Sequence, residues 1–174
     1  MHGWGCLAYC LLDTHLHLLL QTPEPNLGLG MKWFQGSYAQ DFNYRHARRG
    51  HVFGGRFYSQ RIRCDEHLLA ALVYVALNPV RAGLVRQPED WRWSSYAATV
   101  GLASASAVVD TARALELFAD EPEAARRRLR AAVEERLAQD LDERVRAGPE
   151  PMGLTPPFGV RGSRVRPVGP DRSV

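Results

Sequence analysis

Lysine is almost absent from this sequence of 174 residues. Lys32 is the only lysine among the 22 basic residues, and all the others are arginine. Arginine suits bidentate contacts with phosphate groups, although a GC-rich genome would produce the same bias without functional meaning. Residues 1–100 hold 10 basic and 7 acidic side chains, and residues 101–174 hold 12 of each, so the net charge of +3 lies wholly in the first part.

Cysteine is scarce as well, and long hydrophobic runs are missing. The three cysteines include no CxxC pair, which argues against a disulfide framework and a cysteine zinc site and fits a reducing cytoplasm. No apolar stretch approaches membrane-spanning length, and the first 15 residues lack the basic and small-residue features of a signal peptide. We therefore expect a cytoplasmic protein with no membrane partner.

The first hundred residues alternate between strand-like and helix-like patterns. Two apolar runs, 6–12 and 15–21, are separated by Asp13 and Thr14, which predicts a hairpin. A strand with a glycine pair is expected over 52–63. A helix is expected over 26–45, with Asn26 as its N-cap, and a second helix begins at Asp65 and ends at Pro79. The apolar stripe expected to pack the first helix consists of Met31, Phe34, Tyr38 and Phe42.

The pattern changes after Gly101. A short helix is expected over 110–119 and a long one over 123–147, whose other faces alternate in charge as solvated helices do. The long helix carries an apolar stripe of Leu129, Val133, Leu137, Leu141 and Val145. Proline, glycine and arginine dominate 148–174, where we expect disorder. The predicted organisation is a domain over 1–101, a helical extension over 102–147 and a tail.

Two histidines stand two positions apart in the motif HLH. In a strand, His15 and His17 would face the same side and could hold one divalent ion. Taken alone, this pattern more often reflects hydrogen-bonded or exposed histidines than metal ligands.

Tyr74 and Asn78 lie four positions apart on the second predicted helix and so share a face. A nearby cation can lower the pKa of a tyrosine, and an amide oxygen can bind the same ion. The competing interpretation, favoured by helix periodicity alone, is that Tyr74 is a core aromatic residue.

Arginines and aromatic residues are interleaved between the two predicted helices. Such a mixture suits single-stranded or looped nucleic acid, and a solvated basic surface is an equally good interpretation. The candidate DNA-binding residues are Arg45, Arg48, Arg49, Arg56 and Arg61, with Arg81 beyond the second helix.

Four segments in order resemble the REP-associated tyrosine transposases, which are single-tyrosine HUH transposases. They are AYCLLDTHLHLLLQTP, NLGLGMKWFQGSYAQDFNYRHARRGHVFGGRF, LLAALVYVALNPVRAGLV and WRWSSY, within residues 7–101. The resemblance implies an α+β fold with a ferredoxin-like βαββαβ sheet. It also implies metal-dependent cleavage and transfer of single-stranded or hairpin DNA, with nucleoid association and a homodimer as a candidate assembly.

The resemblance assigns roles by position. His15 and His17 would bind Mg²⁺ or Mn²⁺, Asn78 would be the third ligand, and Tyr74 would form a 5′-phosphotyrosine link to the DNA. Thr14 stands where the family usually has asparagine. In a strand its side chain would point away from the metal, so we expect it to affect only the turn or the orientation of a metal ligand.

The family also has a strand and a helix ahead of AYCLL. This chain starts too late to supply them, so we expect an incomplete sheet, as in a truncated gene product or one with a misplaced start codon. The alternative function is therefore an inactive remnant that only binds DNA. A related replication initiator or relaxase fits the flanking motifs less well, and a zinc hydrolase fits least, because no further histidine or carboxylate motif completes its site.

Overall fold

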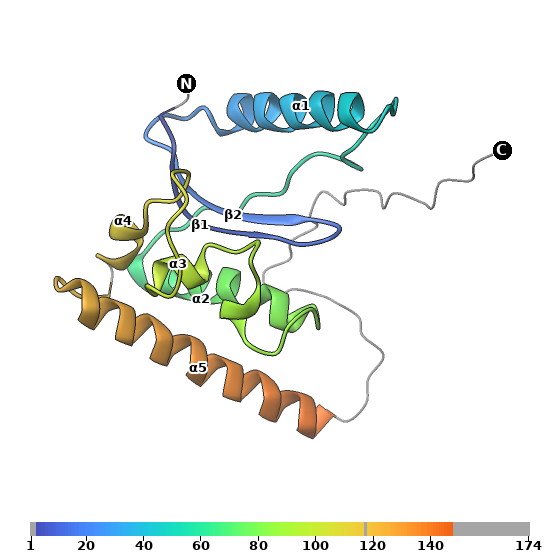
Figure 1. The fold of residues 1–174 in the computed structure, drawn as a ribbon. Helices are drawn as coiled ribbons and strands as arrows, with labels where there is room; N and C mark the ends of the chain where they lie inside the picture. Colours follow the sequence, from blue (N-terminus) through green and yellow to red (C-terminus); the bar gives the residue numbers. More distant parts are fainter. Residues whose placement is uncertain (1–2, 117, 148–174) are drawn as a thin grey trace.

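The structure, a computed structural model, describes residues 3–116 and 118–147, and these form an α+β fold (Figure 1). The α+β prediction is therefore confirmed at this level. The elements in chain order are β1 (Gly5–Leu11), β2 (Leu16–Gln21), α1 (Leu27–Arg45), α2 (Asp65–Arg81), the 3₁₀ helix η1 (Pro88–Asp90), α3 (Tyr96–Thr99), α4 (Thr111–Leu115) and α5 (Pro122–Ala147).

The two strands form the expected antiparallel hairpin. Cys10 pairs with His17 and Ala8 with Leu19, and all four residues are buried on the face that meets α2. The outer edge of β1 is covered by later segments, since the Leu11 amide donates to the Trp93 carbonyl and the Asp110 amide to the Cys6 carbonyl. Among the described residues, β1 is the only strand paired with β2.

Helix α2 is the centre of the core. Its residues from Leu72 to Pro79 are all buried, and it packs against β1, β2 and α5. The prediction that Pro79 ends this helix is wrong, because α2 continues to Arg81. Proline removes only one intrahelical hydrogen bond, and here its ring is fully buried in the core. Cys64, rather than Asp65, occupies the N-cap position.

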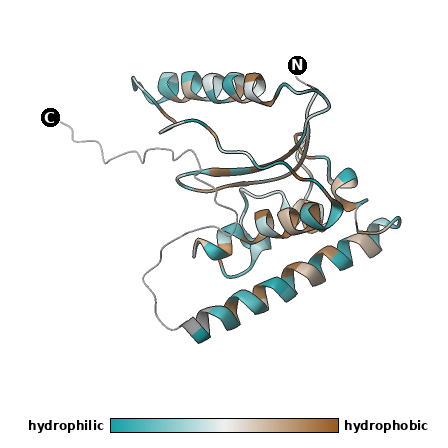
Figure 2. Cartoon of the chain, turned by 180° about the vertical axis from the view of Figure 1, so that it is seen from behind, coloured by the Kyte–Doolittle hydropathy of each residue, from teal (hydrophilic) through white to brown (hydrophobic). Residues whose placement is uncertain are grey.

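Helix α5 adds its first half to the same core. Leu129 and Val133 are buried, Leu137 is partly buried and Leu141 is exposed, so the apolar stripe fades along the helix. The side chain of Val145 and the tail 148–174 lie outside the described residues. In Figure 2, α5 is hydrophilic over most of its length, with hydrophobic residues at intervals.

Helix α1 lies on the opposite side of the hairpin from α2 and α5 (Figures 1 and 2). Its predicted packing stripe is confirmed in part: Met31 is buried, Phe34 and Phe42 are half-buried, and Tyr38 is exposed. Asn26 does occupy the N-cap position but makes no cap hydrogen bond, because its side chain accepts one from the Trp4 indole at 2.6 Å.

The prediction of a strand over 52–63 is also wrong. Residues 54–63 form neither helix nor strand. A strand needs a neighbour for its backbone hydrogen bonds, and β1 and β2 pair only with each other in the described sheet. This segment instead borders a hollow beside β2.

Candidate functional site

The two histidines lie at the start of β2 with their rings in contact. His15 immediately precedes the strand and His17 is its second residue. The hairpin is closed by a hydrogen bond from the Leu12 amide to the His15 carbonyl at 2.8 Å. The ring centroids are 4.9 Å apart and the planes are nearly perpendicular. The pattern HLH therefore brings both imidazoles to one place, as the strand geometry predicted.

His17 is the buried member of the pair. Its Nε2 atom is buried and has no hydrogen-bond partner among the described residues. Burial, and to a lesser degree the neighbouring His15, lowers the pKa of His17 to about 4. The imidazole is therefore neutral at pH 7, which is the form that binds a metal ion. A buried ring nitrogen without a partner is costly unless a ligand satisfies it.

His15 is held from the turn. The Thr14 hydroxyl lies 3.1 Å from Nδ1 of His15. A partner on one ring nitrogen orients the ring. Thr14 thus contacts the candidate ligand directly, in agreement with the effect expected from its position.

Tyr74 packs edge-on against His17. The ring centroids are 5.4 Å apart with an interplanar angle of 89°, and Tyr74 is 9% exposed. Burial raises the pKa of Tyr74, while Arg81 and a hydrogen bond with Asn78 act in the opposite direction. The interpretation of Tyr74 as a core aromatic residue is confirmed by its burial, and its ring also touches a candidate metal ligand. The role of Tyr74 as a nucleophile stays a prediction.

Asn78 follows Tyr74 by one helical turn and is buried. Its Nδ2 donates to the Tyr74 carbonyl at 2.8 Å. With the amide nitrogen engaged in this way, the side-chain oxygen remains as the acceptor for a ligand.

These residues offer few ligand atoms for a divalent ion. Within 3–116 and 118–147, no group of three histidine, cysteine or acidic side chains is placed to hold a metal. The available donors are two imidazoles and the amide oxygen of Asn78, which leaves coordination positions for water or substrate oxygens. The unpartnered Nε2 of His17 is the observation that favours a ligand here.

Arg81 reaches the site from the last turn of α2. Its guanidinium carbon lies 5.3 Å from the centre of the Tyr74 ring, and its Nε donates to Asp140 of α5 at 2.7 Å. The sequence predicted Arg81 as a candidate DNA-binding residue beyond this helix, whereas it is the last residue of α2, and Asp140 was not predicted. No signal in the sequence marks Asp140 among the many charged residues of α5.

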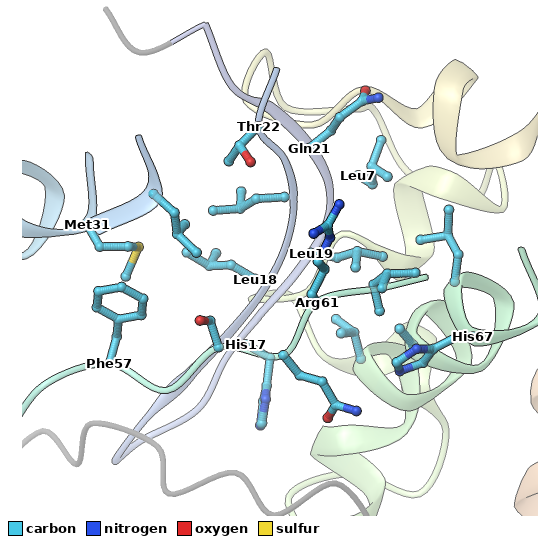
Figure 3. Close-up of a pocket in the computed structure, with 18 of the residues that line it drawn as sticks. Leu7, His17, Leu18, Leu19, Gln21, Thr22, Met31, Phe57, Arg61 and His67 are labelled. Atoms are coloured by element: carbon cyan, nitrogen blue, oxygen red, sulfur yellow. The ribbon is translucent and has the colours of Figure 1, made fainter. Parts of the chain in front are cut away.

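A hollow of about 1090 Å³ opens beside β2 and is lined by His17, Tyr74 and Arg61. Figure 3 shows Met31 and Phe57 at one side and His67 at another. His67 was also missed from the sequence, although it precedes Tyr74 by seven positions and so shares its helix face.

The other candidate DNA-binding arginines lie away from this hollow, on α1 and the segment after it. Arg45 is exposed and paired with Asp41 at 2.9 Å, and Arg48 lies over the Phe42 ring. Arg49 and Arg56 are exposed. The structure therefore brings Arg61 and Arg81 to the site and leaves four arginines outside it.

Two curated proteins are similar to this chain. A protein of Haemophilus influenzae with REP-associated tyrosine transposase in its name is 30% identical over 101 residues, which cover 52% of this chain and 57% of the relative. The REP-associated tyrosine transposase of Escherichia coli K12 is 25% identical over 89 residues, covering 51% and 52%. The resemblance to REP-associated tyrosine transposases is confirmed, and the chain spans about half the length of the curated relatives it matches.

No family model and no solved structure matches the chain. In the described part of the chain, no helix has the length and hydrophobicity needed to cross a bilayer.

Proposed function

We propose that this chain carries the DNA cleavage and strand-transfer site of a REP-associated tyrosine transposase. The observation that carries the proposal is the contact between His17 and Tyr74, 5.4 Å between ring centroids, at a buried imidazole nitrogen that lacks a partner. The names of the two relatives support the same activity. The hairpin and α2 would then be the part of a ferredoxin-like HUH domain that holds the site.

Tyr74 is the nucleophile in this proposal. Its Oη forms a bond to the phosphorus of single-stranded DNA while the bond between phosphorus and the 3′ oxygen breaks. The phenol proton leaves to solvent, and the 3′ oxygen takes one up to become a 3′-OH, so a 5′-phosphotyrosine remains. Attack of a 3′-OH on this link reverses the step and transfers the strand without ATP.

The protein's own residues prepare this step. His15, His17 and Asn78 would hold Mg²⁺ or Mn²⁺, and such an ion polarises a phosphate and offsets its charge. Arg81 and Arg61 supply positive charge next to Tyr74 and in the adjoining hollow. The partner is single-stranded or hairpin DNA, and the assembly and nucleoid association expected from the family are part of the same proposal.

The test is covalent capture of DNA by the full chain. Purified protein is mixed with labelled single-stranded hairpin DNA and Mg²⁺ or Mn²⁺, and the adduct is resolved on a denaturing gel. Tyr74→Phe removes the nucleophile, so the adduct falls to background, and a chelator does the same to the unmodified chain. Tyr44→Phe is the matched control, because Tyr44 is 88% exposed and does not line the hollow.

Cleavage that survives in Tyr74→Phe contradicts the assignment of the nucleophile. Salt-sensitive DNA binding without any adduct in the unmodified chain would instead favour the binding remnant.

A further inference from the structure

Helix α5 meets the end of α2 through an ion pair that is largely shielded from solvent. Nε of Arg81 donates to Oδ2 of Asp140 at 2.7 Å, and the two side chains are only 17% and 12% exposed. The other oxygen of Asp140 lies 2.9 Å from Arg136. Both carboxylate oxygens are therefore engaged, and the position of Asp140 is fixed from two sides.

The same guanidinium lies against Tyr74. Arg81 follows Tyr74 by seven positions, two turns along one face of α2, and its guanidinium carbon is 5.3 Å from the ring centre. Cations are attracted to the face of an aromatic ring at this distance. The three residues thus form a continuous contact series from Asp140 through Arg81 to Tyr74.

The ion pair lies near the end of the core packing of α5. Leu129 and Val133 are buried and Leu137 is partly buried, whereas Leu141 is exposed. A long arginine side chain has many rotamers, so a fixed carboxylate is an effective means of keeping its guanidinium in one place.

We propose that Asp140 is a positioning residue for the nucleophile. It holds the Arg81 guanidinium beside Tyr74, where the guanidinium binds a phosphate of the strand under attack. The inference rests on the proposed function, and it extends the site to a helix outside the segment that resembles the transposases. Asp140 itself touches neither DNA nor Tyr74 in this proposal.

The first test compares Asp140→Asn with Glu143→Gln. Both changes remove one carboxylate from α5, but Glu143 is exposed and contacts Arg136 rather than Arg81. In Asp140→Asn, the single-turnover cleavage rate falls by roughly 10- to 100-fold, as expected for a misplaced reacting group. The loss falls mainly on the rate and less on the KM for DNA, because one phosphate contact is displaced rather than the whole strand. Glu143→Gln leaves both parameters unchanged.

A spectroscopic readout reports on position without any reaction. Nuclear Overhauser contacts between the Arg81 side chain and the Tyr74 ring, assigned with Tyr74→Phe, are lost in Asp140→Asn and kept in Glu143→Gln. Contacts that persist in Asp140→Asn overturn the proposal. If the unmodified chain forms no covalent adduct, the proposed function fails, while this measurement still decides whether Asp140 positions Arg81.

A double-mutant cycle with Arg81→Gln separates positioning from a direct effect of the charge. If Asp140 acts only through Arg81, Asp140→Asn has no further effect on the cleavage rate in the Arg81→Gln background. Additive effects overturn the proposal. The double variant also removes both buried charges, so it avoids leaving either one unpaired.

Asp140→Asn leaves a buried guanidinium without its carboxylate and so carries a risk of unfolding. Asp140→Glu then decides the question, because it keeps the charge and displaces the carboxylate by one methylene group. The Arg81–Tyr74 contacts are altered and the cleavage rate falls in a folded Asp140→Glu protein. A folded variant identical to the unmodified chain in both measurements overturns the proposal.

Discussion

Helices α1 and α2 have similar lengths, 19 and 17 residues, but opposite surroundings. In α2 every residue from Leu72 to Pro79 is buried, whereas α1 buries only Gly30 and Met31 and leaves Trp33 65% exposed. The candidate nucleophile, Tyr74, lies on α2, the helix that is packed into the core. The histidine strand β2 lies between these two regions, so the site is formed where a well-packed half meets a loosely packed one.

The largest effect on the free energy of unfolding is expected from a change in the core between α2 and α5. Leu129→Ala empties a buried position between α5 and the core and lowers the free energy of unfolding by about 2–5 kcal/mol. Leu141→Ala on the same helix removes an exposed side chain and changes it by less than about 0.5 kcal/mol. Urea unfolding followed by circular dichroism measures both. Equal losses in the two variants would contradict the described packing of α5.

The second prediction concerns pH at the boundary between the two halves. The pKa of His17 is lowered from 6.5 to about 4, so the unfolded chain takes up this proton first as the pH falls. The stability that the neutral, buried ring contributes is present above about pH 6.5 and is lost as the pH falls toward 4, by roughly 3 kcal/mol in total.

The measurement is the unfolding free energy of metal-free protein between pH 4 and 7. His17→Gln abolishes this part of the pH dependence, and His51→Gln, at an exposed position, retains it. An unchanged profile in His17→Gln would show that His17 does not titrate as its burial indicates.

The third prediction tests whether a change in the loosely packed helix α1 stays confined to that helix. A Cβ added at Gly30 would lie 2.0 Å from the Trp4 ring, so Gly30→Ala forces the indole away and breaks its 2.6 Å hydrogen bond to Asn26. We expect a loss of about 1–3 kcal/mol, with the damage confined to α1. Nuclear magnetic resonance of the Trp4 indole N–H follows the bond directly.

Gly36→Ala is the matched control on the same helix, since nothing lies within 4 Å of an added Cβ there. It removes a poor helix former and stabilises the protein by up to about 1 kcal/mol. Spectral changes that spread from Gly30→Ala into α2 would mean that the two halves are coupled more tightly than their packing indicates.

The parts of the fold that local pattern determines were predictable. The hairpin followed from two apolar runs around a polar turn, and α1, α2, α4 and α5 followed from helical periodicity, within a few residues at the ends. The prediction of a strand over 52–63 failed, because the residue pattern gives a tendency to form a strand but cannot supply the neighbouring strand that its backbone needs. The stripe of α1 likewise predicts an apolar face, and only tertiary packing decides whether that face is covered.

The site divides in the same way. His15 and His17 were predictable from a period of two and Tyr74 with Asn78 from a helical turn, because each pair is local. The contact between His17 and Tyr74 depends on α2 packing against β2, which no spacing encodes. Asp140 lies 59 residues from Arg81, and its charge resembles that of its neighbours on α5, so only the structure identifies it as the partner.

The two edges of the hairpin differ in a way that affects how the protein behaves in solution. Backbone groups of β1 are covered by Trp93 and Asp110, but among the described residues β2 has no strand on its other side. An open strand edge is a template for pairing with another chain. The outward-facing amides of β2 should therefore exchange faster than the amides of β1 that later segments cover. Self-association at high concentration would begin at β2, beside the histidines.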